Sequence, residues 1–240
     1  MTANELIYAG KAKKLFTTDT PDVLWVEYLD QATALNGLKK DTVIGKGQLN
    51  NQITSRVFDY LTAKGIKHHF IKQESATEQT IQRLSIIPLE VVVRNVVAGS
   101  FAKRFGLEEG AKLAQPIVEF YYKKDELDDP FINDAHVLFL DVATETEIAE
   151  LKAQALEINQ VLIELFNQLG IQLVDFKLEF GRNQAGEIVL GDEISPDTCR
   201  LWDKETGDHL DKDVYRREIG GIVSVYEEVL RRLEQLEGEK

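Results

Sequence analysis

The sequence contains a single cysteine, Cys199, among its 240 residues. One cysteine excludes an internal disulfide and a zinc site built from several cysteines, and it is typical of proteins of the reducing cytoplasm. The chain also has no apolar run approaching the ~20 residues that a helix needs to span a bilayer. Its first residues form no basic segment followed by an apolar one. We therefore expect a cytoplasmic protein without a membrane partner.

Positive charge is scarce, because 28 lysines and arginines face 41 aspartates and glutamates and give a net charge of -13. Proteins that bind nucleic acid through its phosphates are normally basic, so a nucleic-acid partner is not expected. Lysines and arginines gathered in a cleft can still attract a small anion, since local charge outweighs the distant exterior there. The composition thus favours small-molecule partners.

Proline is scarce too, with five in the chain, and neither a proline-rich linker nor an internal repeat divides it. The first residues alternate short apolar runs with turn residues, which predicts an antiparallel meander. A helix with an apolar face is predicted at 51–64, with Gly65 as its stop. The predicted strands of the N-terminal half lie at residues 6–8, 12–16, 23–28, 69–72 and 90–97.

The clearest helix signal lies at residues 145–169, where apolar residues recur at a spacing of three and four and form one stripe. Thr144 and Glu147 match a capping box at its start, and Gly170 is a suitable stop at its end. Two strands are predicted after it, at 172–180 and 187–190.

A last helix is predicted at 214–236, with Ile219 on its inward face. Strands and helices are partly segregated along the chain, which favours the α+β class over a regular parallel α/β sheet. A cleft between two lobes is a usual place for a ligand. The expected lobes are an antiparallel, strand-rich N-terminal lobe and a mixed α/β C-terminal lobe, at residues 1–88 and 89–240.

The segment at 8–14 combines a glycine with lysines. Gly10 allows the backbone to approach a ligand closely, and in a strand Lys11 and Lys13 project from the same face. Two cations beside an open turn suit a polyphosphate. The same residues also fit a solvated hairpin, since the segment is neither a Walker loop nor a dinucleotide fingerprint.

Strict alternation at 174–180 places Asp175, Lys177 and Glu179 on the face opposite the apolar residues. We expect the following hairpin to bring Asp192 and Glu193 opposite the start of this strand. Carboxylates converging near one lysine suit Mg²⁺, a hard ion that also binds nucleotide phosphates. Which carboxylates bind the metal depends on the strand register. The alternative is a surface hairpin with charge pairs.

An arginine interrupts the β-forming apolar run at 86–97. A half-buried Arg94 needs an anionic partner, and the turn at 98–100 offers free amides and the Ser100 hydroxyl as a phosphate cradle. Two purely structural roles explain these residues equally well. Arg94 could pair with Glu90, and Ser100 could cap a helix that begins at Phe101.

Two polar loops complete the candidates. The loop at 192–202 holds three carboxylates and Arg200, whereas the loop at 123–134 is best interpreted as solvated. Cys199 is expected to be a small buried residue, because no histidine near it suggests a thiolate nucleophile. The histidines show no metal spacing and none is assigned to catalysis; they are His68, His69, His136 and His209.

Taken together, these segments resemble the SAICAR synthetase family. Each is moderately specific, but their order and spacing extend over nearly the whole chain. The matching stretches are residues 10–13, 46–51, 86–100, 129–130, 173–181, 191–197 and 200–203. A departure lies in the loop at 30–36, where many relatives carry a second acidic residue.

The resemblance implies an enzyme of purine biosynthesis. Its ligase reaction uses ATP to join L-aspartate to the carboxylate of carboxyaminoimidazole ribonucleotide. It also implies two lobes distantly similar to protein kinases, with ATP between them, a Mg²⁺ ion and a homodimer. A carboxylate is a poor electrophile, so activation as an acyl phosphate is expected. Positioning and charge neutralisation then matter more than a nucleophilic side chain.

The resemblance also implies roles for individual residues. Those expected to contact ATP are Gly10, Lys11, Ala12 and Lys13. Those expected to hold Mg²⁺ at the nucleotide are Glu179 and Asp192. Those expected to bind the ribonucleotide are Arg94, Ser100, Asp129 and Arg200. Those expected at the reacting carboxylate are Asp175, Lys177 and Arg200.

Two other functions use the same features. A small-molecule kinase or another carboxylate–amine ligase would turn over ATP with a different acceptor. A nucleotide-sensing module would bind ATP without turnover, which fits poorly with so many converging carboxylates.

Overall fold

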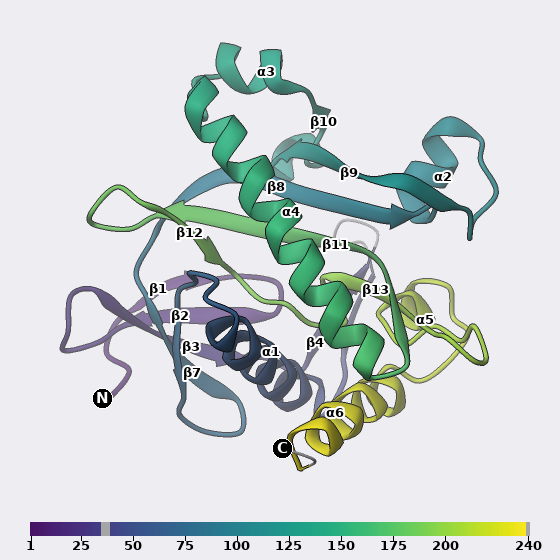
Figure 1. The fold of residues 1–240 in the computed structure, drawn as a ribbon. Coiled ribbons are helices and arrows are strands. Elements are labelled where there is room, and N and C mark those ends of the chain that lie inside the picture. The colour runs from purple at the N-terminus through teal and green to yellow at the C-terminus, as the bar shows by residue number, and fades with distance from the viewer. Residues whose placement is uncertain (35–38, 239–240) are drawn as a thin grey trace.

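The computed structural model describes residues 1–34 and 39–238 (Figure 1). The expected mixture of helices and strands is confirmed. The helices are α1 (Lys46–Ala63), α2 (Gly99–Phe105), the 3-10 turn η1 (Asp125–Leu127), α3 (Asp134–Phe139), α4 (Glu145–Gln168), α5 (Asp213–Arg216) and α6 (Ile222–Gly238). The strands are β1 (Leu6–Ala9), β2 (Lys13–Thr17), β3 (Val23–Tyr28), β4 (Gln31–Ala34), β5 (Lys39–Thr42), β6 (Phe70–Gln73), β7 (Glu78–Gln82), β8 (Ser85–Val96), β9 (Lys112–Tyr122), β10 (Phe131–Ile132), β11 (Ile171–Arg182), β12 (Ile188–Gly191) and β13 (Cys199–Asp203).

The N-terminal strands build a five-stranded antiparallel sheet in the order β1-β2-β3-β7-β6. The predicted meander of the first three strands is therefore confirmed. Strand β7 was missed because its sequence, EQTIQ, has one aliphatic residue among polar ones. Leu24, Val26, Tyr28 and Ile81 form a small buried apolar cluster in this sheet.

A six-stranded antiparallel sheet follows in the order β10-β9-β8-β11-β12, with β13 paired to β11. Figure 1 shows α4 lying across it. The predicted alternation along β11 is confirmed, since Phe176, Leu178 and Phe180 are buried in the main core. The residues between them lie on the opposite face, which is left free for polar groups.

Helix α4 agrees with the prediction for residues 145–169. Thr144 and Glu147 form the expected capping box, in which each side chain bonds to the other's backbone amide. Gly170 adopts a left-handed φ of 69°, a conformation that glycine takes without strain. None of the described helices combines the length and apolar composition that crossing a membrane requires.

Helix α1 begins five residues before the predicted start. Asp30 explains the earlier start, because its carboxylate accepts hydrogen bonds from the amides of Gly45 and Gly47 at 3.0 and 2.8 Å. An anion there also suits the positive end of the helix. A Cβ on Gly47 would lie 2.8 Å from the Tyr28 carbonyl, so only glycine lets α1 approach β3 this closely. Leu35 and Asn36, at the end of the divergent loop, lie outside the described residues.

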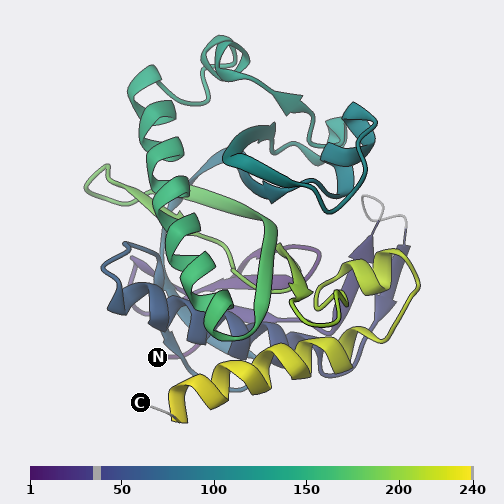
Figure 2. The ribbon, with the colours of Figure 1, turned by 45° about the vertical axis from the view of Figure 1, so that its right-hand side comes forward.

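The single helix predicted at 214–236 is wrong. The chain forms the short α5, breaks, and restarts as α6, which runs beneath α1 in Figure 2. Glu218 in the break adopts a left-handed φ of 57°, and Gly220 and Gly221 follow it. Ile219 is consequently 59% exposed rather than turned inward.

The predicted hairpin register is also wrong. Gly191 pairs with Glu179, so Asp192 and Glu193 follow beside the middle of β11 and not opposite its start. The start of β11 pairs instead with β13, where Ile171 faces Asp203. The reason is length: β11 has twelve residues and β12 only four, so the partner strand leaves the ladder early.

Candidate active site

The polar face of the six-stranded sheet and the apolar cluster of the five-stranded sheet border one cavity of about 1160 Å³. The structure brings together all the residues singled out from the sequence for ligand binding or catalysis. They are Gly10, Lys11, Ala12, Lys13, Arg94, Ser100, Asp129, Asp175, Lys177, Glu179, Asp192 and Arg200.

The charge of the cavity differs from that of the whole protein. Among the described residues that line it are nine lysines and arginines and eight aspartates and glutamates. The protein as a whole carries a net charge of -13. The lining is therefore close to neutral, and the exterior carries nearly all of the excess negative charge. Anionic ligands can bind where the local charges favour them.

One part of the lining is apolar. Leu24, Val26 and Ile81 face the cavity from the five-stranded sheet, and Leu15, Leu84 and Ile86 extend this surface. Flat aromatic groups bind well against such aliphatic walls, since burial removes apolar surface from water. This wall can hold the base of a nucleotide.

At one end of the cavity, lysines and carboxylates form a network that we call the lysine–carboxylate cluster. It consists of Lys13, Lys123, Lys177, Glu90, Glu179, Asp192 and Glu193. The Nζ atom of Lys177 lies 3.0 Å from Asp192 and 3.6 Å from Glu90, and it contacts Glu179. The second lysine, Lys13, contacts Asp192 and lies 3.5 Å from Glu193.

Strand register assembles this cluster. Glu179 on β11 faces Glu90 on β8, and the turn after β12 delivers Asp192 in a left-handed conformation with φ 57°. Burial opposes ionisation of Asp192, but Lys13 and Lys177 outweigh it and hold the pKa of this carboxyl well below its ordinary value. The same attraction overcomes burial at Lys177 and raises the pKa of its amine. Asp192 and Lys177 are therefore charged, whereas burial raises the pKa of Glu90 and of Glu193.

The cluster also has an excess of negative charge, because four carboxylates face three lysines. In addition, the Oε2 atom of Glu193 is buried without a hydrogen-bond partner. Buried polar atoms normally have partners, so this oxygen and the charge excess both indicate room for a cation.

At the other end lies the arginine cluster. It consists of Arg94, Arg104, Arg200, Arg216, Arg217, Glu109, Glu119, Asp175 and Asp213. Arg94 donates to Glu119 at 2.6 Å and to Asp175 at 2.8 Å, and Arg200 reaches Asp175 at 3.0 Å. Five arginines face four carboxylates here, so this cluster has a positive excess.

Both structural roles considered for Arg94 and Ser100 are wrong. Arg94 pairs with Glu119 and Asp175, while Glu90 lies nearest to Lys177. Helix α2 begins at Gly99 after Ala98, so Ser100 is not its cap; its hydroxyl accepts a hydrogen bond from Arg94 at 3.1 Å.

The turn at 98–100 lies directly against an arginine. Gly99 has φ 54°, and a Cβ on it would lie 2.4 Å from Nη2 of Arg200. Any other residue would push the guanidinium away. Gly99 also donates its amide to Glu109 at 2.8 Å, which fixes the turn from the outside.

Sequence reasoning missed several cavity residues. Lys212 directly precedes α5 and Arg216 ends it, and both line the cavity. Burial lowers the pKa of Lys212, although Asp197 lies 3.6 Å away. Lys123 belongs to a loop predicted to be solvated, yet it contacts Glu179. The closely spaced charges at 211–213 and the two glycines at 220 and 221 were the sequence signals that could have indicated a polar turn before the last helix.

Comparison with known proteins gives one consistent result. The SAICAR synthetase family profile matches residues 6–233. The phosphoribosylaminoimidazole-succinocarboxamide synthase of Enterococcus faecalis is 64% identical, over 97% of this chain and 98% of that protein. The crystal structure of the Ehrlichia chaffeensis synthase is 46% identical, with a TM-score of 0.93 over 96% of this chain and 98% of that one.

A further solved structure bears on the ligand. It is a SAICAR synthetase in complex with ADP, 49% identical to this chain. Its TM-score is 0.91, and the match covers 94% of this chain and 96% of that chain.

Proposed function

The chain belongs to the SAICAR synthetase family, and on that premise we propose how its cavity binds the substrates. Family membership gives the reaction: an ATP-dependent ligase joins L-aspartate to the carboxylate of carboxyaminoimidazole ribonucleotide, forming SAICAR, ADP and phosphate. The observation that carries the binding proposal is the opposite charge excess of the two clusters.

ATP binds with its base against the apolar wall and its phosphates toward Lys11 and Lys13. The ADP held by a 49% identical relative supports a nucleotide site in this fold. Gly10 and Ala12 border the phosphates through their backbone, where small residues leave room. Lys13 is largely buried and Lys11 half exposed, so Lys13 makes the stronger contact.

Glu179 and Asp192 are the residues that would hold Mg²⁺. The fit rests on hard carboxylate oxygens, the excess negative charge and the unpartnered oxygen of Glu193. A bound Mg²⁺ would neutralise phosphate charge during transfer. Lys177 contacts both carboxylates and Lys123 contacts Glu179, so these lysines neutralise part of their charge.

The ribonucleotide binds at the arginine cluster. Arg94 and Arg200, with the Ser100 hydroxyl, face its phosphate, and Asp129, which also lines the cavity, can accept from a hydroxyl. Arginine suits this task because its planar group can grip phosphate through two parallel hydrogen bonds. The positive excess of the cluster supports an anion here.

Strand β11 connects the two clusters. Asp175 belongs to the arginine cluster, while Lys177 and Glu179 belong to the other. Alternate residues of a strand lie about 7 Å apart, so the ribonucleotide and the nucleotide phosphates meet near Lys177. Asp175 orients Arg94 and Arg200, and the Lys177 ammonium faces the reacting carboxylate.

The chemistry follows from that arrangement. A carboxylate oxygen of the ribonucleotide attacks the γ-phosphorus and ADP leaves, which yields an acyl phosphate. The aspartate amine then attacks the acyl carbon, phosphate leaves, and the nitrogen loses a proton. Lysines and arginines neutralise the developing charge, which suits a reaction that depends on positioning.

Three broader features belong to the same proposal. The chain forms two lobes distantly similar to those of kinases, at residues 1–88 and 89–240; the two separate sheets support two lobes, and the boundary falls within β8. The enzyme is a homodimer. It works in the cytoplasm, which is consistent with Cys199 being free and buried.

ADP release tests the function directly. The enzyme is given ATP and Mg²⁺ with aspartate and the ribonucleotide, singly and together. Rapid release is expected only with both substrates present. Release with one acceptor alone would indicate a kinase, and nucleotide binding without release a sensing module.

A further inference from the structure

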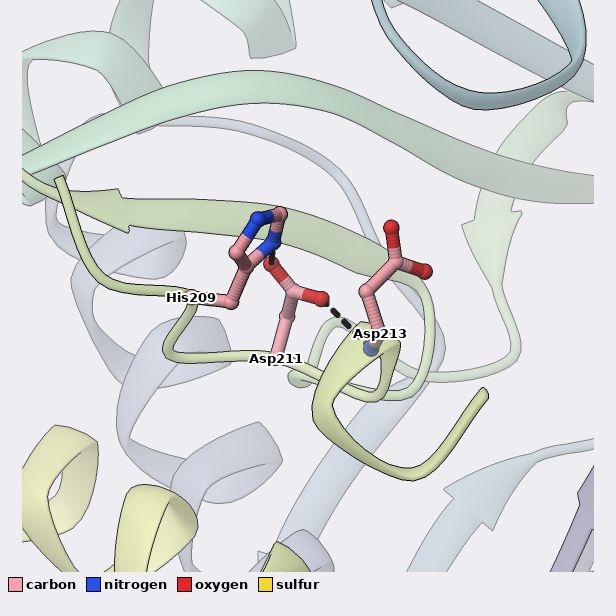
Figure 3. Close-up of side chains that lie close together, drawn as sticks. All are labelled: His209, Asp211 and Asp213. Atoms are coloured by element: carbon pink, nitrogen blue, oxygen red, sulfur yellow. Dashed lines mark hydrogen bonds and ion pairs between the residues drawn. The ribbon is translucent and has the colours of Figure 1, made fainter. Parts of the chain in front are cut away.

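Three potential metal ligands lie together beside the arginine cluster. His209, Asp211 and Asp213 bring one ligand atom each within 4.8 Å of the others (Figure 3). However, the Asp213 carboxylate already contacts Arg200 at 3.0 Å and Arg216 at 2.7 Å. Figure 3 shows it turned away from the other two side chains. These carboxylates therefore serve protein groups and not an ion.

Asp211 is fully buried, and both of its oxygens accept hydrogen bonds from the backbone. The amide of Leu201 donates at 2.8 Å, and the amide of Asp213 donates at 2.7 Å. Leu201 directly follows Arg200 on β13, and Asp213 is the carboxylate that contacts Arg200. One side chain thus anchors both flanks of this arginine.

We propose that Asp211 is a positioning residue that holds Arg200 in its orientation toward the ribonucleotide. Asp211 fixes the strand that carries Arg200 and the turn that carries its partner Asp213. It is absent from the residues that line the cavity, so it acts through Arg200. The inference rests on the proposed role of Arg200 in binding the ribonucleotide.

The local geometry shows why an anchor is needed. The pairing of β11 with β13 shifts register between Leu173 and Asp175, so the ladder beside Arg200 is irregular. On the outer edge of β13 the backbone pairs with the returning segment, since Leu210 donates to the Leu201 carbonyl at 2.7 Å and Asp203 donates to the Asp208 carbonyl at 2.8 Å, but the Leu201 amide still needs a partner there. The Asp211 carboxylate supplies such a partner for Leu201.

The conformational entropy of a long side chain is a second reason for holding Arg200 in place. A free arginine side chain loses rotamer freedom when it is fixed, and this loss opposes binding. Asp175 and Asp213 fix Arg200 before substrate binds, each at 3.0 Å. Binding then proceeds without that loss, provided that Asp213 stays in place. Lys212 lies between the two aspartates and faces the cavity, so the same anchor places it too.

The test is Asp211→Asn, with KM measured for all three substrates. The asparagine amide nitrogen cannot accept, so one backbone amide loses its partner. We expect KM for the ribonucleotide to rise about tenfold, while KM for ATP and aspartate change by less than about threefold. An unchanged ribonucleotide KM in a folded variant overturns the proposal.

Asp203→Asn is the matched control. One oxygen of Asp203, on the same segment, accepts the backbone amides of Glu205 at 2.8 Å and Thr206 at 3.0 Å, and its other oxygen contacts Arg232 at 2.6 Å. It is not among the residues that line the cavity. This variant should lower the melting temperature and leave all three KM values unchanged. A matching rise in ribonucleotide KM would mean that Asp211 has only a structural role.

Arg200→Ala separates this inference from the proposed function. If Arg200→Ala leaves the ribonucleotide KM unchanged, the proposed role of Arg200 fails. If it raises KM, adding Asp211→Asn to it should have less than about a threefold further effect, because Asp211 acts through Arg200. A full tenfold further effect would contradict the inference alone. Where Asp211→Asn does not fold, Asp213→Asn replaces it, and an unchanged ribonucleotide KM there has the same meaning.

Discussion

The two ends of the cavity use the same kinds of residue to opposite effect. The lysine–carboxylate cluster has one more carboxylate than lysines, and the arginine cluster has one more arginine than carboxylates. The first keeps an unpartnered carboxylate oxygen on Glu193. The second lies against the turn at Gly99. A small imbalance within a dense network is enough to prepare one end for a cation and the other for an anion.

The difference also shows how an acidic protein can bind anionic substrates. Pairing with lysines and arginines offsets part of the cost of burying these carboxylates. The charges left without a partner then determine whether the local charge at each end of the cavity is negative or positive. The choice of cation agrees with this division, since ammonium groups surround the nucleotide end and planar guanidinium groups the phosphate of the ribonucleotide. The four predictions below test the division.

The largest effect is expected at the carboxylates. Glu179→Gln or Asp192→Asn removes a hard anionic ligand and should lower kcat about a thousandfold, or about 4 kcal/mol, with little change in ribonucleotide KM. Glu187→Gln, on the exposed turn of the same hairpin, is the control and should be neutral. Near-normal turnover in both variants at saturating Mg²⁺ would remove the metal assignment.

Arg94→Lys should affect the other end. Lysine cannot reproduce the fork of bonds to Glu119, Asp175 and a phosphate, so ribonucleotide KM should rise at least about tenfold, or about 1.4 kcal/mol. KM for ATP and aspartate should move much less. Arg182→Lys, which alters an ion pair outside the cavity, is the control. A lower melting temperature with an unchanged ribonucleotide KM would make Arg94 purely structural.

The two lysines near Gly10 should differ from each other. Lys13 pairs with Asp192 and Glu193 and is largely buried, whereas Lys11 pairs with Asp125 and is half exposed. Lys13→Ala should weaken nucleotide binding about five- to tenfold in calorimetry, and Lys11→Ala about two- to threefold, because water screens the exposed charge. Unchanged nucleotide affinity in both variants would make these lysines simple surface charges.

The smallest effect concerns pH at the lysine–carboxylate end. His69 donates from Nε2 to the Asp192 carbonyl at 2.9 Å, and burial, reinforced by Lys13, lowers the pKa of His69 to about 4. Unfolding restores the ordinary value of 6.5, so the unfolded chain binds more protons between these pH values. Stability should therefore fall as pH drops from 6.5 to 4, by up to about 3 kcal/mol.

His69→Gln should remove most of that slope, since glutamine does not titrate. Urea unfolding across this pH range measures it, and the half-buried His68→Gln is the matched control with a smaller effect. An identical slope in wild type and His69→Gln would show that His69 is not buried as a neutral ring.

Those parts of the fold and the site could be predicted whose structure depends on a short-range sequence pattern. The alternation at Asp175, Lys177 and Glu179 fixes a face whatever the neighbours are, and the capping box at Thr144 acts within a single turn. Partners of Arg94 could not be predicted, because Glu119 comes from β9, which sequence reasoning had missed. The register of Asp192 depends on how far β12 continues, which is a property of the whole sheet.

The measurement that tests the division most directly is ribonucleotide affinity, determined by calorimetry without nucleotide. It compares wild type with Asp192→Asn and Arg94→Lys. We predict that Arg94→Lys weakens binding at least about tenfold and that Asp192→Asn leaves it within about twofold. Equal weakening in both variants, or weakening in Asp192→Asn alone, would contradict the account of two oppositely charged ends.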